Sequence, residues 1–206
     1  MRKYILVTLI VILIVASGVH KIQSQTKENQ YKTQNINIDQ PIQPIRPTNL
    51  DIIKLSMITG WSIETSTYFV EEANSRGVKV FEEALPIASI ESGNTYRFDL
   101  IHYNTNRTTD QGLFQINDVL YSTIVKSLKK EGREFKSWDR FNQEFNIAAG
   151  ILWIDYLKSE HQLEGHRLFS SYNKGVYGAR QYASRCGTYE TEYSRKVYVI
   201  KNELLK

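Results

Sequence analysis

The stretch Ala84-Leu-Pro-Ile-Ala-Ser-Ile-Glu-Ser-Gly93 is an apolar run that ends in a carboxylate and a glycine. Its pattern predicts a helix from about residue 80 to 92 that ends at Gly93, and Pro86 should either kink this helix or lie just after its start. On this helix Glu91 is expected to be half-buried with a raised pKa, which would let its carboxyl group donate a proton near neutral pH. Helical spacing places four small or apolar residues on the same face as Glu91: Ala88, Ile87, Ala84 and Val80.

The remaining apolar patterns predict more helices and one small hairpin. Alternating apolar residues in 96–103, followed by a polar turn at 104–109, indicate the β-hairpin. A glycine-rich segment over 173–187 is expected to separate the last two helices. The expected fold class is α+β, mainly α, with the hairpin beside the helix that carries Glu91. The other helices are expected over 65–74, 119–128, 142–158, 166–172 and 191–205.

The first 50 residues differ in composition from the rest of the chain. Residues 1–19 join a basic end to an apolar stretch and then small residues, which indicates an export signal peptide or, if uncleaved, a membrane anchor. Residues 20–50, rich in Gln, Asn, Lys and Thr, predict a flexible linker that ends in a polyproline II spacer. We therefore expect one domain over 51–206, secreted to the wall or periplasm or held at the cytoplasmic membrane by the N-terminal segment.

Charge and residue counts exclude several classes of function. The net charge is +4, but residues 1–50 hold six Lys/Arg against two Asp/Glu, so residues 51–206 are balanced and give no reason to expect a nucleic-acid partner. The single cysteine, Cys186, excludes an internal disulfide. The four histidines show no metal-binding spacing, and no phosphate loop or nucleophile elbow is present. We therefore expect neither a metal nor a cofactor.

Three motifs occur in a fixed order: Glu91-Ser-Gly93, Gly112-Leu-Phe-Gln-Ile-Asn117 and Ser171-Tyr-Asn-Lys-Gly175. Together they resemble the soluble-lytic-transglycosylase-like (SLT) branch of the lysozyme superfamily, over roughly residues 77–197. The resemblance implies a lysozyme-like domain that cleaves the β-1,4 bond between N-acetylmuramic acid and N-acetylglucosamine in peptidoglycan, leaving 1,6-anhydromuramoyl ends. It is compatible with work in a conjugation, secretion or phage assembly, or in wall turnover.

The resemblance also assigns roles to individual residues. The matching glutamate of the family is the acid and base, so Glu91 takes that role here. Two positions depart from the family pattern: Lys174 stands where a small residue is usual, and Trp153 replaces a tyrosine. The positions implied to contact substrate are Ser92, Gln115, Asn117, Tyr172, Asn173 and Tyr193.

Asp110 leaves the reaction open. Thr108-Thr-Asp-Gln-Gly112 resembles the stretch of animal-type lysozymes that carries their second catalytic carboxylate, which would make the protein a muramidase that hydrolyses the same bond. Alternatively, Asp110 only braces the hairpin turn, as aspartates in turns do when they bind nearby backbone. A third alternative is a non-catalytic wall-binding module, which would tolerate the loss of Glu91.

Overall fold

The structure is a computed structural model, and it describes residues 49–135 and 141–206 of the chain. The predicted signal peptide or anchor over 1–19, and the linker over 20–50 except its last two residues, lie outside the described residues. Among the residues that are described, no helix has both the length and the apolar character needed to cross a membrane.

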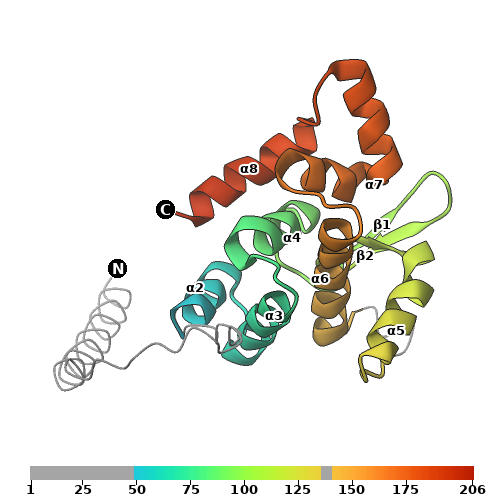
Figure 1. Cartoon of the computed structure of the whole chain (residues 1–206). Coiled ribbons are helices and arrows are strands. Elements are labelled where there is room, and N and C mark those ends of the chain that lie inside the picture. The colour runs from blue at the N-terminus through green and yellow to red at the C-terminus, as the bar shows by residue number, and fades with distance from the viewer. Residues whose placement is uncertain (1–48, 136–140) are drawn as a thin grey trace, which may run out of the picture. The chain divides into compact units, whose positions relative to one another are not determined.

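Helices make up most of the described chain, and a small sheet lies at one side (Figure 1). The helical elements are α2 (Asn49–Thr59), α3 (Ile63–Ser75), the π-helical turn η1 (Val80–Ala84), α4 (Leu85–Glu91), the 3-10 turn η2 (Asp118–Leu120), α5 (Tyr121–Lys130), α6 (Gln143–Ser159), α7 (Gly165–Cys186) and α8 (Glu192–Leu204). The strands are β1 (Ile101–Tyr103), β2 (Thr109–Gln111) and β3 (Ile116–Asn117).

The sheet is antiparallel in the order β1-β2-β3. Its register pairs Asp110 of β2 with His102 of β1 and with Asn117 of β3. The predicted hairpin is thus confirmed, with β3 as an additional short strand. The predicted class, α+β and mainly α, is confirmed as well.

Helix α6 is the centre of the hydrophobic core, since nine of its residues are buried. At Gly150 an added Cβ would lie 2.1 Å from the Phe114 ring, so only glycine lets the segment before β3 pack directly on α6. The Phe114 ring also stacks on Phe69 of α3, with centroids 6.0 Å apart. These contacts hold α3, α6 and the Gly112–Asn117 segment together.

The helix that carries Glu91 starts just before Pro86, which is one of the two arrangements predicted for this proline. The chain first makes the π-helical turn η1, in which the backbone N–H of Leu85 bonds to the carbonyl of Val80 five residues earlier. The α-helix proper starts at Leu85, so Pro86 lies in its first turn, where a missing N–H breaks no helical hydrogen bond. Gly93 follows the end of α4 with φ 61°, a left-handed conformation that suits glycine, and this confirms the predicted helix end.

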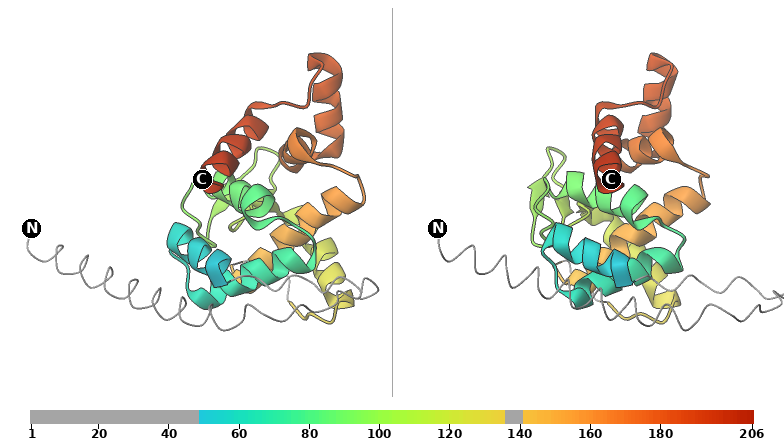
Figure 2. Two further views of the ribbon diagram at one scale, coloured as in Figure 1. Left: turned by 60° about the vertical axis from the view of Figure 1, so that its left-hand side comes forward. Right: turned by 90° about the vertical axis from the view of Figure 1, so that its left-hand side faces the viewer.

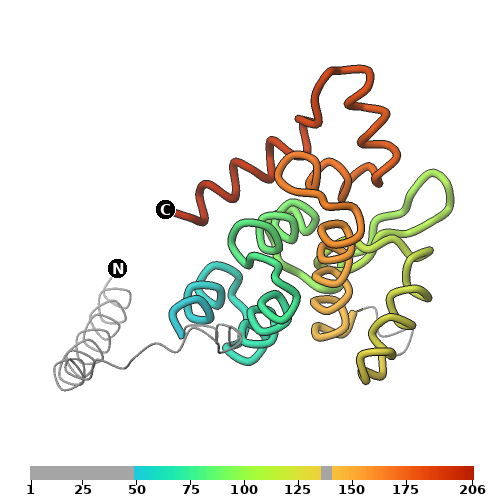
Figure 3. Tube along the Cα trace, in the orientation of Figure 1, coloured from blue at the N-terminus to red at the C-terminus, as the bar shows by residue number. Residues whose placement is uncertain are grey.

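The prediction that the glycine-rich segment 173–187 separates two helices was wrong. Helix α7 runs from Gly165 to Cys186 and is interrupted only at Gly175, whose φ of 69° and ψ of 160° are not helical. The glycine content of this segment indicated a loop. In the structure Gly178 is helical, and only Gly175 changes the direction of the helix. Figure 3 shows the change of direction, and in both views of Figure 2 the second half of α7 stands away from the other helices. We call residues 173–187 the arm.

Candidate active site

Glu91 lies at the end of α4, in the wall of a cavity of about 290 Å³. The end of one helix, the sheet, the middle of α6 and the bend of α7 meet there. We call this the Glu91 cavity. Its lining residues are Glu91, Asp110, Gln115, Ile116, Asn117, Leu120, Trp153, Tyr172, Asn173 and Gly175.

Burial dominates the electrostatics of Glu91. Removal of the carboxyl group from water raises its pKa to about 7, and the negative charge of Asp110 adds to the increase. The Tyr193 hydroxyl opposes it by donating a hydrogen bond to Glu91 Oε1 at 2.6 Å. With a pKa of about 7, the carboxyl group can both donate and accept a proton near neutral pH. The predicted raised pKa is therefore present in the structure.

Two tyrosines flank this carboxyl group. Tyr193, near the start of α8, reaches Glu91 from 102 positions along the chain. Tyr172 of α7 donates its hydroxyl to the backbone carbonyl of Phe114 at 2.7 Å, which fixes the bend of α7 against the segment before β3. Burial raises the pKa of both tyrosines well above the usual value, and the charge of Glu91 adds to this, so both remain hydrogen-bond donors.

Asp110 faces the same cavity, but both of its oxygens already accept hydrogen bonds. Asn117 donates Nδ2 to Oδ1 at 2.6 Å across the β2–β3 pair, and Asn104 donates Nδ2 to Oδ2 at 3.0 Å from the hairpin turn. Asn104 was not predicted as a site residue, because the signal in the sequence is only that of a turn. Asp110 is thus placed both to brace the hairpin and to influence Glu91.

The Gly112–Asn117 motif has a local structural reason. Gly112 has φ 77°, and a Cβ there would lie 1.7 Å from the Asn146 side chain, whose Oδ1 accepts from the Leu113 N–H at 2.7 Å. Gln115 also has a positive φ, 47°, and its Nε2 donates to the Gly112 carbonyl at 2.7 Å. This tight turn directs Gln115 and Asn117 into the Glu91 cavity.

The structure brings all but one of the residues predicted to contact substrate to the region of Glu91. Gln115, Asn117, Tyr172 and Asn173 line the Glu91 cavity, and Tyr193 bonds to Glu91 itself. Ser92 is not brought there. It is buried, and its Oγ accepts from the Tyr96 N–H at 3.0 Å, which ties the end of α4 to the following loop.

Sequence reasoning did not predict four lining residues. Trp153 was noticed as a departure from the family pattern and as part of the apolar side of its helix, and in the structure it stacks on Tyr156 while lining the cavity. Of the other three, Ile116 and Gly175 belong to the quoted motifs but were given no role, and Leu120 lies outside the motifs. They contribute apolar surface and backbone, which keep water away from the carboxyl group.

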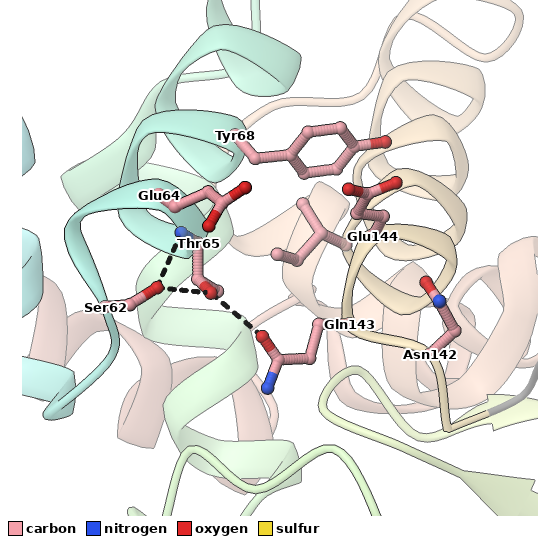
Figure 4. A pocket seen from close by; sticks show the side chains of 8 residues that line it. Ser62, Glu64, Thr65, Tyr68, Asn142, Gln143 and Glu144 are labelled. Carbon is pink, nitrogen blue, oxygen red and sulfur yellow. Dashed lines mark hydrogen bonds between the residues drawn. The ribbon is translucent and has the colours of Figure 1, made fainter.

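Figure 4 shows a second cavity, of about 360 Å³, between α3 and α6. Thr65 of α3 donates its hydroxyl to Gln143 Oε1 of α6 at 2.8 Å, which joins the two helix starts. The two carboxylates of this α3–α6 cavity, Glu64 and Glu144, are both exposed. The lining residues are Ser62, Glu64, Thr65, Tyr68, Asn142, Gln143, Glu144 and Ile147.

Within residues 49–135 and 141–206, no group of three or more His, Cys, Asp or Glu side chains could hold a metal ion. The Glu91 cavity offers one poised carboxyl group, a second carboxylate and several amide and hydroxyl groups. No protein-family model, curated protein or solved structure matches the chain.

Proposed function

We propose that the protein is a peptidoglycan lytic transglycosylase with a lysozyme-like catalytic domain. The observation that carries the proposal is the Glu91 carboxyl group, buried at a cavity wall with its pKa raised to about 7 and held by Tyr193. Cleavage of a glycosidic bond needs such an acid, and the side-chain amides of Gln115 and Asn173 in the same cavity are suitable partners for the acetamido and hydroxyl groups of a glycan. The proposal also places the domain outside the cytoplasmic membrane, where its substrate lies.

In the proposed reaction Glu91 acts twice. The protonated carboxyl group gives its proton to the oxygen between the muramoyl and glucosaminyl units, and the bond from the muramoyl C1 to that oxygen breaks. The C6 hydroxyl of the same muramoyl unit then bonds to C1, and its proton passes to the Glu91 carboxylate. The products are a 1,6-anhydromuramoyl end and a free glucosaminyl C4 hydroxyl, and the enzyme regains its starting state. A pKa near neutral serves both steps, because one group must first donate and then accept.

The hydrogen bonds of Asp110 favour this reaction over hydrolysis. Both Asp110 oxygens accept hydrogen bonds from side-chain amides, that of Asn117 in β3 and that of Asn104 in the hairpin turn, so the carboxylate helps to hold the sheet together. A muramidase remains the second candidate, because Asp110 lines the same cavity as Glu91 and could stabilise positive charge at C1 or form a covalent intermediate there.

Mass spectrometry of the products tests the proposal. Peptidoglycan digested by the protein should yield anhydromuropeptides, which are lighter by one water than the hydrolysis products and resist borohydride reduction. Asp110→Asn should keep at least roughly a tenth of the wild-type rate, because the asparagine changes a bracing contact and not a reacting group.

The opposite result would support the muramidase. In that case the digest contains only reducible muramic-acid ends, and Asp110→Asn loses roughly a hundredfold or more in rate while keeping its melting temperature. A protein that binds peptidoglycan but releases neither product would instead be a wall-binding module.

A further inference from the structure

A third cavity lies next to Tyr193, the hydrogen-bond partner of Glu91. Its volume is about 570 Å³, and it opens between the arm, the start of α8 and the end of α4. Asn173 lines both this cavity and the Glu91 cavity, while Tyr193 lines the third cavity and bonds to Glu91. We call it the Lys174 cavity. The two cavities therefore adjoin each other at Asn173.

The Lys174 cavity has an excess of positive charge. Its lining includes three cations, Lys174, Arg195 and Lys196, and a single carboxylate, Glu192. That carboxylate pairs with Lys196 at 2.8 Å. Among the described residues no carboxylate forms an ion pair with Lys174 or Arg195, and both side chains are exposed. The Lys174 ammonium group instead lies over the ring of Tyr182, 5.8 Å from its centroid, and Tyr182 lines the same cavity.

The arm as a whole is also basic. Residues 173–187 contain Lys174, Arg180 and Arg185 and no Asp or Glu. Residues 51–206 as a whole contain equal numbers of acidic and basic residues. Of the three arm cations only Lys174 lines the Lys174 cavity, where together with Arg195 it leaves an excess of positive charge that favours an anionic ligand.

The substrate of the proposed function carries such groups. Each muramoyl unit bears, through its lactyl group, a peptide stem with several free carboxylates, whereas a muramoyl unit without its stem keeps only the single lactyl carboxylate, attached directly to the sugar ring. An Arg guanidinium group matches the geometry of a carboxylate, and a Lys ammonium group adds a second donor. We propose that Lys174 and Arg195 bind stem-peptide carboxylates, so that the enzyme prefers peptide-bearing strands to stripped glycan. This inference rests on the proposed function and names a specificity that the catalytic residues do not supply.

The test compares two substrates and two double variants. Glycan strands with their peptides, and the same strands stripped by an amidase, are digested by wild type, by Lys174→Ala/Arg195→Ala and by the control Lys129→Ala/Lys130→Ala. The control removes two exposed charges at the end of α5. The wild type and the control should have a lower KM for peptide-bearing strands. The cavity variant should lose this preference, with KM raised roughly fivefold or more on peptide-bearing strands only. Added salt should reduce the wild-type preference.

Other outcomes overturn the inference. It fails if the wild type cleaves both substrates equally well, or if the cavity variant and the control behave alike. It also fails if removal of anionic wall polymers, and not of the peptides, abolishes the preference.

Failure of the proposed function can be distinguished from failure of the inference. If the wild type releases no anhydromuropeptides from either substrate, the inference is tested by measuring how tightly two ligands bind to the Glu91→Gln variant. A disaccharide-peptide should then bind more tightly than the free disaccharide, and Lys174→Ala/Arg195→Ala added to Glu91→Gln should remove the difference. Equal binding of the two ligands would reject the inference whatever the catalytic result.

Discussion

The Glu91 cavity and the α3–α6 cavity are of similar size, and each presents two carboxylates, but the surroundings of those carboxylates differ. Glu91 is the last residue of its helix, at the negative end of the helix dipole, and it shares its cavity with Ile116, Leu120 and Trp153. Glu64 and Glu144 lie in the first turns of α3 and α6, where the dipole favours a negative charge, and both are exposed. The comparison teaches that a carboxylate in a cavity is not enough, since it is the burial of Glu91 that raises its pKa.

The largest expected effect is on catalysis. Glu91→Gln should reduce the release of muropeptides by roughly a thousandfold, because the amide is close in size but cannot transfer the proton. The matched variant Glu144→Gln, made in the α3–α6 cavity, should keep the wild-type rate. Both rates are measured on purified peptidoglycan, with melting temperatures as the control for folding. A folded Glu91→Gln protein with the wild-type rate would remove Glu91 from the mechanism.

The next effect is on stability and depends on pH. The pKa of Glu91 rises from 4.5 in the unfolded chain to about 7 in the folded protein, so between these pH values the folded state binds more protons. Its contribution to stability is therefore complete below pH 4.5 and is lost as the pH rises through 7. We therefore compare the free energy of unfolding of Glu91→Gln with that of wild type at each pH. The difference, variant minus wild type, should increase by about 3 kcal/mol from pH 4 to pH 8.5.

Denaturant unfolding at both pH values measures this difference. Glu144→Gln is the control, and its stability should differ from wild type by less than about 1 kcal/mol at either pH, because an exposed carboxylate at a helix start gains little from the dipole. If Glu91→Gln shows no more dependence on pH than the control, the buried carboxyl group is not the one with the raised pKa.

The smallest expected effect concerns the neighbours of Glu91. The Tyr193 hydrogen bond lowers the pKa of Glu91, so Tyr193→Phe should move the alkaline limb of the rate profile to higher pH, by about one unit. The charge of Asp110 raises that pKa, so Asp110→Asn should move the limb to lower pH. Opposite shifts in pH-rate profiles would support the arrangement, whereas shifts in the same direction would contradict it.

Several features of this site could be predicted because they depend on residues close together in the sequence. The spacing of Ala84 and Ala88 predicted the buried face of the helix, and Gly93 predicted its end beside Glu91. The polar turn at 104–109 predicted the hairpin. The arm was the exception, because composition does not reveal that Gly175 alone leaves the helical conformation.

The sequence by itself determined the helix that carries the acid, where the acid lies on that helix, and the motifs that led to the proposed function. Only the tertiary structure decided that Tyr193 donates to Glu91, that Trp153 lines the cavity, and that Lys174 and Arg195 line a neighbouring one. The physical reason is that helix periodicity and turn chemistry act over a few residues, whereas these contacts join segments up to 102 positions apart. Such contacts depend on how α6 packs against α3 and how α8 packs against α4, and those packings come from the shapes of many side chains together.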